Sequence, residues 1–331
     1  LPGGLAVATI LSCAVFAAIS GSSPVTLLAV GSILYPALLK EGYSKKFSLG
    51  ALASGGTLGV VIPPSIPMIL YAIATDKSIS DLFLAGIIPG LMLAGVLSVY
   101  ALIANRKIQS EPFNFVQTVQ AFRYGIFALM TPVILLGGIY SGFFLATEAA
   151  AIAVGYSLFV EVFIHREIHI TEFFSIAVDT ARLLGTLFPI IAIAISINLL
   201  LTAESVPQDF ATWMTTVVDN KITFLIALNI FLLVIGCLID IGSAILMLAP
   251  ILLPVAMAYG IDPIHFGIIM VVNLEIGFIT PPVGLNLIVA MTAFKEDFVL
   301  ICRSVLPFIC LMLAVLVLVV FIPELSLFLI R

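Results

Sequence analysis

The stretch that decides the fold is GVVIPPSIPMILYA (Gly59–Ala72), which returns 218 residues later as GFITPPVGLNLIVA (Gly277–Ala290). The same offset aligns Pro36 with Pro254 without a gap. Each copy places a double proline inside apolar sequence, and proline removes a backbone donor and pushes the preceding residue out of the helical conformation. An internal repeat with an interrupted hydrophobic segment in both copies is typical of secondary transporters and points to their binding site.

The composition indicates a membrane protein. Of the 331 residues, 62% are hydrophobic and 9% are charged, whereas a soluble domain carries roughly 25% charged residues. Apolar runs long enough to cross a bilayer recur, for example 82–104 and 303–322. The alternating segments of a membrane β-barrel do not dominate, and no basic stripe suggests a nucleic-acid partner. We therefore predict an all-α polytopic membrane protein.

Two further apolar stretches are predicted to be re-entrant helical hairpins. The first has two arms of about 15 residues on either side of Ser20–Pro24, and each arm is too short to span the bilayer comfortably. The pattern returns around Cys237–Ser243. Each half of the chain is thus expected to contain a hairpin followed by a broken helix, with the helix breaks at Ile62–Pro64 and Thr280–Pro282.

The distribution of positive charge predicts the orientation. If the first hairpin enters and leaves by one face, tracing the chain puts most of its Lys and Arg residues on that face, and the positive-inside rule makes that face cytoplasmic. These residues are Lys40, Lys45, Lys46, Arg106, Lys107, Arg123, Arg166, Lys295 and Arg303. By the same tracing the second hairpin opens to the outside, so the two repeats are predicted to be inverted.

The four interruptions predict where ions and substrate bind. Backbone groups freed at membrane depth must be buried in protein or line a cavity; unwound carbonyls suit Na⁺ and half-helix N-termini suit a carboxylate. The candidate Na⁺ ligands are Ser20, Ser22, Ser23, Gly56, Thr57, Gly59, Asp240, Gly242, Ser243, Gly277 and Thr280. The candidate substrate contacts are Pro64, Ser65, Pro282, Gly284 and Asn286. The alternative is that proline and glycine only kink or pack these helices.

Four polar residues have specific interpretations, and for three of them two alternatives remain open. Asp240 is a carboxylate at a hairpin tip, which is costly in apolar surroundings unless it binds a cation or a partner; it could also cap the following helix. Glu275 could couple an ion or a proton, or pair with another helix. Glu148 is best explained as a helix-start carboxylate. Asn286 could bind substrate or tie down a loose carbonyl.

The chain resembles, over essentially all its residues, the large membrane subunit of tripartite ATP-independent periplasmic (TRAP) transporters. The stretches that carry the resemblance are ISGSSPVT (Ile19–Thr26), GVVIPPSIPMILY (Gly59–Tyr71), LAGIIPG (Leu84–Gly90), GGIYSGFFLATEAAA (Gly137–Ala151), HFGIIMVVNLEIGFITPPVGLNL (His265–Leu287) and VLPF (Val305–Phe308).

The resemblance implies a multi-pass protein of the bacterial inner membrane that imports an organic acid, such as a C4-dicarboxylate or sialic acid, with two or more Na⁺ ions. It implies two partners, a small four-helix membrane subunit and a periplasmic substrate-binding protein. It also implies an elevator mechanism in an ion-transporter-like fold, in which a mobile transport domain moves against a scaffold, and it places Na⁺ between each hairpin tip and the adjacent broken helix.

Mapped onto the sequence, the resemblance divides the chain into five parts. These are 1–75, the first half of the transport domain; 76–118, a spanning helix and linker; 119–221, scaffold helices and an arm; 222–293, the second half of the transport domain; and 294–331, the last spanning helix. The second repeat has about 100 residues of helices before its hairpin, and the offset places their counterpart before Leu1. We therefore expect further N-terminal scaffold helices in the natural polypeptide.

Rival functions remain to be separated by experiment. Broken helices also build the selectivity filters of ion channels, but a channel would show no coupling to Na⁺. A related Na⁺/anion symporter would need no soluble binding protein. An intramembrane enzyme is disfavoured because the sequence has no GxSxG, HExxH or P-loop and its three histidines are scattered.

Overall fold

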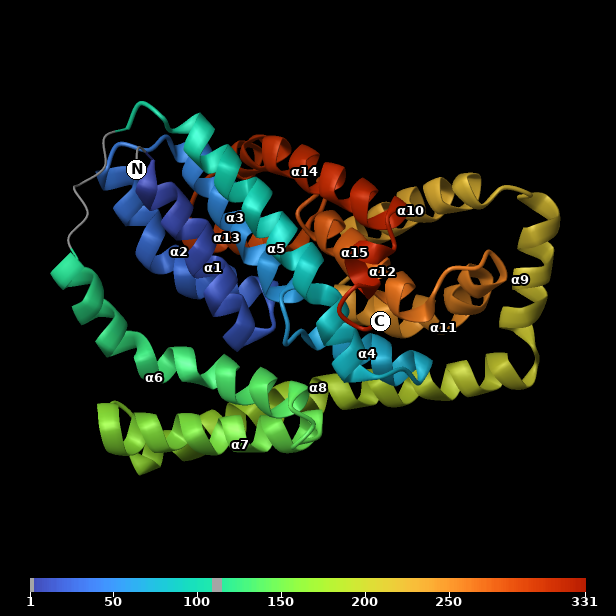
Figure 1. Cartoon of the computed structure of the whole chain (residues 1–331), viewed down its shortest axis with the longest axis horizontal. Helices are drawn as coiled ribbons and strands as arrows, with labels where there is room; N and C mark the ends of the chain where they lie inside the picture. Colours follow the sequence, from blue (N-terminus) through green and yellow to red (C-terminus); the bar gives the residue numbers. More distant parts are fainter. Residues whose placement is uncertain (1–2, 109–114) are drawn as a thin grey trace. The chain divides into compact units, whose positions relative to one another are not determined.

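The computed structural model describes residues 3–108 and 115–331, and Figure 1 shows that these are folded into helices. Within this described part, nine helical segments are long and apolar enough to cross a bilayer, which confirms the prediction of a polytopic helical membrane protein. The chain divides into two compact units, Leu1–Glu111 with Leu201–Arg331 (unit 1) and Pro112–Leu200 (unit 2). The assignment of mobile and scaffold parts stays a prediction.

The first half of unit 1 contains the predicted hairpin and broken helix. The helices are α1 (Gly4–Ser20), α2 (Ser23–Lys40), α3 (Lys45–Val61), α4 (Ile66–Thr75) and α5 (Ile79–Ala104). The hairpin is interrupted only at Gly21 and Ser22, a shorter break than the predicted Ser20–Pro24. Pro24 lies in the first turn of α2, where a helix needs no backbone donor, so proline begins this helix instead of breaking it.

The second half of unit 1 repeats this order. Its helices are α9 (Val206–Val217), α10 (Lys221–Leu238), α11 (Ile241–Ala258), α12 (Pro263–Phe278), α13 (Leu285–Phe294), α14 (Phe298–Phe321) and α15 (Glu324–Leu327). Adding 218 to the bounds of α1 to α5 reproduces the bounds of α10 to α14 to within one residue. The Pro63–Pro64 and Pro281–Pro282 peptide bonds are both cis. α15 has no counterpart in the sequence-based expectation.

Several helices begin earlier than their apolar runs suggest, because polar residues cap them. α5 begins at Ile79 and not at Leu82, since the Ser78 hydroxyl accepts a hydrogen bond from the Asp81 backbone N–H at 3.2 Å. α14 begins at Phe298 and not at Arg303, because Asp297 accepts from Leu300 N at 3.1 Å. Such side chains satisfy backbone donors that the first turn leaves free.

The two broken helices form the core of unit 1. Every residue from Phe47 to Val61 in α3, and from His265 to Phe278 in α12, is buried. A helix that is apolar around its whole circumference belongs in the interior. α3 packs against α1, α2, α5 and α14, α12 packs against α10, α11, α14 and α5, and α3 also contacts α12. These helices of unit 1 appear blue to cyan and orange to red in Figure 1.

The two halves of unit 1 also exchange contacts through the short segments that follow the double prolines. α4 packs on α11, the second arm of the second hairpin, and α13 packs on α2, the second arm of the first hairpin. Each broken helix therefore contacts its own hairpin with one segment and the opposite hairpin with the other. This reciprocal arrangement brings both hairpins and both breaks into a single packed body.

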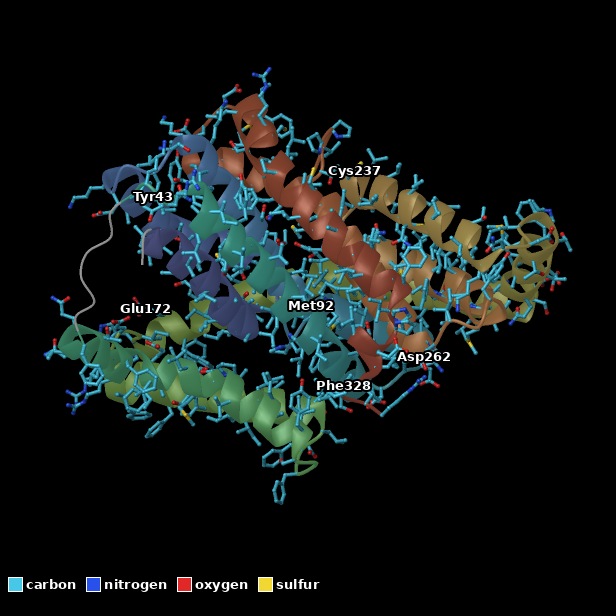
Figure 2. The ribbon with its side chains drawn as sticks, turned by 45° about the horizontal axis from the view of Figure 1, so that its top comes forward. Tyr43, Met92, Glu172, Cys237, Asp262 and Phe328 are labelled. Atoms are coloured by element: carbon cyan, nitrogen blue, oxygen red, sulfur yellow. The ribbon has the colours of Figure 1, made fainter. Side chains whose placement is uncertain are left out.

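Unit 2 contains α6 (Phe115–Tyr140), α7 (Ala146–Phe159) and all but the last turn of α8 (Ile170–Ala203). A π-helical turn at Val160–His165 follows α7. α7 packs against α6. The Glu148 carboxylate accepts from Leu145 N at 2.9 Å, which agrees with its predicted role at a helix start; Glu172, labelled in Figure 2, accepts similarly from His169 N.

Candidate ion and substrate site

The tip of the first hairpin lies against the break of its own half. The backbone N–H of Ile66, at the start of α4, donates to the carbonyl of Gly21 at 3.4 Å. Gly21 has a φ of 61°, a left-handed conformation that glycine adopts without penalty. A Cβ atom added to Gly21 would lie 2.9 Å from the Pro64 carbonyl oxygen. The predicted meeting of Ser20–Pro24 with Ile62–Pro64 is thus present in the structure.

Side-chain and main-chain oxygens gather at this first tip. The Ser20 and Thr26 hydroxyl oxygens are 2.7 Å apart, and the Thr26 hydroxyl donates to the Ser22 carbonyl at 2.9 Å. Thr26 was missing from the predicted ligands. The signal that could have identified it is its position four residues after Ser22, which places it one helical turn above the break.

Gly59 lies directly against these oxygens. A Cβ atom at Gly59 would lie 2.6 Å from the Thr26 hydroxyl oxygen and 2.7 Å from the Ser22 carbonyl oxygen. A Cβ atom at Gly56, one turn earlier, would lie 3.3 Å from the Ser23 carbonyl oxygen. These two glycines therefore let α3 approach the oxygen-rich tip closely. Neutral hydroxyl and carbonyl oxygens are the kind of ligand that Na⁺ takes at unwound helices, so these residues fit the predicted ion.

The second hairpin meets its broken helix through glycine-to-glycine contact. A Cβ atom at Gly277 would lie 2.7 Å from the Cα of Gly236, the last buried glycine of α10. Gly284 N donates to the Cys237 carbonyl at 3.1 Å. Thr280, predicted as an ion ligand, directs its hydroxyl to the Ile276 carbonyl at 2.7 Å. Figure 2 labels Cys237 of α10 and also Asp262, whose carboxylate accepts from Ile264 N at the start of α12.

Asp240 lies at the second tip. Its side chain is exposed there, whereas the sequence predicted apolar surroundings. Its carboxylate accepts a hydrogen bond from Ser243 N at 2.8 Å, and the residue is exposed. The structure therefore gives Asp240 the helix-cap role, which leaves its second oxygen available for a cation. The neighbouring Gly242 contacts the other half of the unit, because a Cβ atom there would lie 3.0 Å from a methyl carbon of Leu70 in α4.

Three other predicted site residues have their polar atoms engaged elsewhere. The Thr57 hydroxyl donates to the Ser54 carbonyl and lies 4.0 Å from the Met312 sulfur in α14, so it is directed toward that helix. The Ser65 hydroxyl accepts from Met68 N at 3.4 Å and caps α4. The Asn286 amide donates to the Ala53 carbonyl at 3.2 Å and is fully buried, which favours the interpretation that it ties down a carbonyl.

The arrangement defines the class of the protein. Helical hairpins that end inside the membrane-embedded body, together with broken helices whose free oxygens face those ends, build the ion and substrate sites of secondary transporters. Irregular backbone at this depth is tolerated only where it is buried or lines a cavity. The chain is therefore a multi-pass membrane protein with the construction of a transporter.

Comparison with known proteins identifies the family. The model of the tripartite ATP-independent periplasmic transporter, DctM component, matches residues 1–325, and the chain belongs to this family. The C4-dicarboxylate TRAP transporter large permease protein DctM of Pseudomonas aeruginosa is 44% identical over 328 residues, which cover 98% of this chain and 77% of that protein.

Two further relatives show how the family varies. The isethionate TRAP transporter permease protein DctMQ of Oleidesulfovibrio alaskensis is 42% identical over 332 residues, covering 99% of this chain and 52% of that protein. The ectoine TRAP transporter large permease protein TeaC of Halomonas elongata is 35% identical over 332 residues, covering 99% of this chain and 78% of that protein.

Proposed function

We propose that this chain is the permease of a Na⁺-coupled importer of a small organic acid in the bacterial inner membrane. The observation that carries the proposal is the first hairpin tip. There, hydroxyl and carbonyl oxygens gather where Gly21 and Gly59 let the hairpin and the broken helix approach each other closely. A cluster of oxygens of this kind at an unwound helix, held inside a packed helical body, is the type of ligand set that Na⁺ takes in secondary transporters.

One Na⁺ ion is proposed at each hairpin tip. At the first tip the ligands would be Ser20, Ser22 and Thr26 with the Pro64 carbonyl. At the second tip the free oxygen of Asp240 would supply negative charge, next to the unwound segment that follows Gly277. Binding at both tips would fix each hairpin against its broken helix, because the ion contacts both elements at once.

The substrate is proposed to bind where α4 and α13 begin. The N-terminus of a helix presents free N–H groups and a positive dipole end, which favour a carboxylate. Pro64 and Ser65 precede α4, and Pro282 and Gly284 precede α13. A C4-dicarboxylate carries two carboxylates, one for each terminus, and the Pseudomonas relative has this substrate in its name. Sialic acid, with one carboxylate, is the alternative within the same mechanism.

The proposed mechanism is an elevator movement of two inverted halves. The buried α3 and α12 and the reciprocal packing of α4 and α13 support a transport domain that moves as one body. The proposed partners are a small membrane subunit and a periplasmic binding protein that delivers the substrate. The relative named DctMQ, of which this chain covers only 52%, is consistent with a permease joined to a further membrane part.

Uptake by the reconstituted system tests the proposal. The permease, small subunit and binding protein would be placed in vesicles, and uptake of labelled succinate would be compared between a Na⁺ gradient and a K⁺ gradient. We expect saturable uptake that requires both Na⁺ and the binding protein. Uptake without coupling to Na⁺ would indicate a channel, and Na⁺-coupled uptake without the binding protein would indicate a symporter. Labelled isethionate and sialic acid would establish the substrate class.

A further inference from the structure

The side chain of Glu275 is the buried carboxylate that the two proposed ion positions leave unexplained. It lies in α12 and is fully buried, with 0% of the residue exposed. Neither of its oxygens accepts a hydrogen bond within the described part of the chain. The side chain that interacts with this carboxyl group is Ser23 of α2, in the opposite half of unit 1. The Ser23 hydroxyl is itself fully buried and without a hydrogen bond of ordinary geometry.

Among the described residues, no basic side chain forms a salt bridge with Glu275. The ionisable residues on the helices packed against α12 are Lys45, Lys46, Tyr71, Asp81, Tyr100, Lys221, Cys237, Cys302, Arg303, Cys310 and Glu324. Lys45, for example, pairs with Glu296 in the loop between α13 and α14. A buried carboxylate without a counter-charge costs several kcal/mol, so a positive charge at this position would be strongly stabilised.

Two other buried oxygens without hydrogen-bond partners lie close along α3. Asn286 donates its amide N–H to the Ala53 carbonyl, and its own oxygen is left without a partner. The next residue in α3, Ser54, also has a buried hydroxyl without a partner. Gly56, three residues after Ala53, approaches the Ser23 carbonyl. Residues three apart share one face of a helix, so Asn286 and Ser23 contact the same stretch of α3.

We propose that Glu275 and Ser23, with Asn286 and Ser54, form a third site for a monovalent cation, which joins the two halves of the proposed transport domain. The site rests on the proposed transport function and adds an ion to the two at the hairpin tips. One carboxylate balances one monovalent charge, whereas a divalent ion would leave an excess positive charge in the interior. Several neutral oxygens beside the carboxylate favour a metal ion such as Na⁺ over a proton, which needs a single donor–acceptor pair.

The number of bound ions tests the site directly. Binding of ²²Na⁺ would be measured on the purified complex of permease and small subunit, for the wild type, Glu275→Gln and Glu41→Gln. Glu41 is an exposed acid in the loop after α2 and serves as the matched control. We expect Glu275→Gln to bind one Na⁺ fewer per complex, and Glu41→Gln to bind the wild-type number. The same number bound by Glu275→Gln would overturn the proposal, and a protonated or purely structural Glu275 would give that result.

A second measurement tests the site independently of whether Glu275→Gln folds well. Na⁺ that binds only the folded protein raises its melting temperature with concentration. Ser23→Ala keeps the carboxylate, so we expect it to retain the wild-type number of ions while the Na⁺ concentration needed for the rise in Tm increases severalfold. An unchanged Na⁺ dependence of Tm in Ser23→Ala would contradict the site. Absence of any Na⁺ binding by the wild type would instead refute the proposed function, so the two failures are distinguishable.

Discussion

The two hairpin tips of unit 1 share a backbone plan and differ in chemistry. Under the offset of 218 residues, Ser20, Ser22 and Thr26 of the first tip correspond to Leu238, Asp240 and Ala244 of the second. Three hydroxyl groups are thus replaced by a single carboxylate between apolar residues. The same architecture can therefore offer a cation either several neutral oxygens or one charged oxygen, and the second arrangement depends more strongly on charge.

The tips also differ in how they meet the broken helices. Ile66 and Gly284 are equivalent positions, and each donates its backbone N–H to its own hairpin. The acceptors are not equivalent, because Gly21 corresponds to Ile239 whereas the second acceptor is Cys237. The second hairpin therefore contacts its break two residues before the position equivalent to Gly21, and Asp240, beyond this contact, is exposed. The two halves have the same order of helices but differ in which hairpin residue contacts the helix break.

The largest expected effect concerns the side of the membrane that each half faces. In a chain with its native cysteines replaced, new cysteines at Lys45 and Ala258, both exposed, should react with a membrane-impermeant reagent from opposite sides. The reason is that the positive charges place the first hairpin loop inside and the inverted second loop outside. Labelling of both positions from one side would show that the halves are parallel and not inverted.

The next largest effect is expected from alanine at Gly59, and it should differ in kind from the effect of alanine at Gly277. Gly59→Ala places a methyl group against the Ser22 carbonyl at the oxygen-rich tip, so it should lower Na⁺-stimulated uptake about tenfold or more, consistent with overpacking costs of about 1–3 kcal/mol. Gly277→Ala meets backbone atoms of Gly236 and should mainly lower the amount of folded protein.

Gly95→Ala is the matched control for both substitutions, because nothing lies within 4 Å of the added Cβ atom. Uptake and folded abundance should both stay close to the wild type in this variant. Equal loss of abundance in Gly59→Ala and Gly277→Ala, with Gly95→Ala unchanged, would show that the first two glycines serve helix packing alone.

A smaller effect is expected from removing charge at the second tip. Asp240→Asn retains a side chain that caps helices well, so abundance should change little. The Na⁺ concentration for half-maximal uptake should rise about fivefold, equal to ~1 kcal/mol at 1.4 kcal/mol per tenfold. Ser22→Ala at the first tip removes one neutral hydroxyl and should have a weaker effect. Unchanged Na⁺ activation in Asp240→Asn would remove Asp240 from the ion site.

The smallest effect concerns the ion pair of Lys45 and Glu296, which links the two halves. Glu296 accepts from Lys45 Nζ at 2.7 Å and from the Tyr35 hydroxyl at 2.8 Å, and these two bonds lower the pKa of its carboxyl group. Its stabilising contribution is therefore complete above the usual glutamate pKa and is lost as pH falls through the lowered value. Because Lys45 is largely exposed, Glu296→Gln should destabilise by less than about 1 kcal/mol.

Melting curves of the wild type and Glu296→Gln at pH 7 and at acidic pH check this prediction. The difference in Tm between the two proteins should be present at pH 7 and should shrink below about pH 4.3, the ordinary glutamate pKa. A Tm difference that grows at acidic pH would contradict the assigned sign.

The helix pattern was largely predictable because proline and apolar run length act locally. The double prolines predicted both broken helices. The interruptions at Ser20–Pro24 and Cys237–Ser243 predicted both hairpins. Helix starts were predicted too late where Ser78 or Asp297 supplied a cap, since capping depends on one polar side chain outside the apolar run. The π-helical turn at Val160–His165 carried no signal in the apolar pattern.

The polar site was predictable only in part, because its details depend on tertiary contacts. The first tip and Gly59 were identified from the break positions, whereas Thr26 was not, since it lies inside an ordinary helical turn. The direction of the Thr57 hydroxyl toward Met312 and the bond from Asn286 to Ala53 join residues more than 230 positions apart. The sequence contains no local pattern that predicts such pairings.

The exchange of α4 and α13 between the halves has a consequence for how the protein is made. Synthesis proceeds from the N-terminus, so the first half enters the bilayer while α11 and α13 have not yet been translated. The surfaces of α4 and α2 that these helices cover then contact lipid or the insertion machinery. These exchanged contacts form only after Phe294 has emerged from the ribosome, so a chain stopped between the halves leaves the faces of α4 and α2 uncovered.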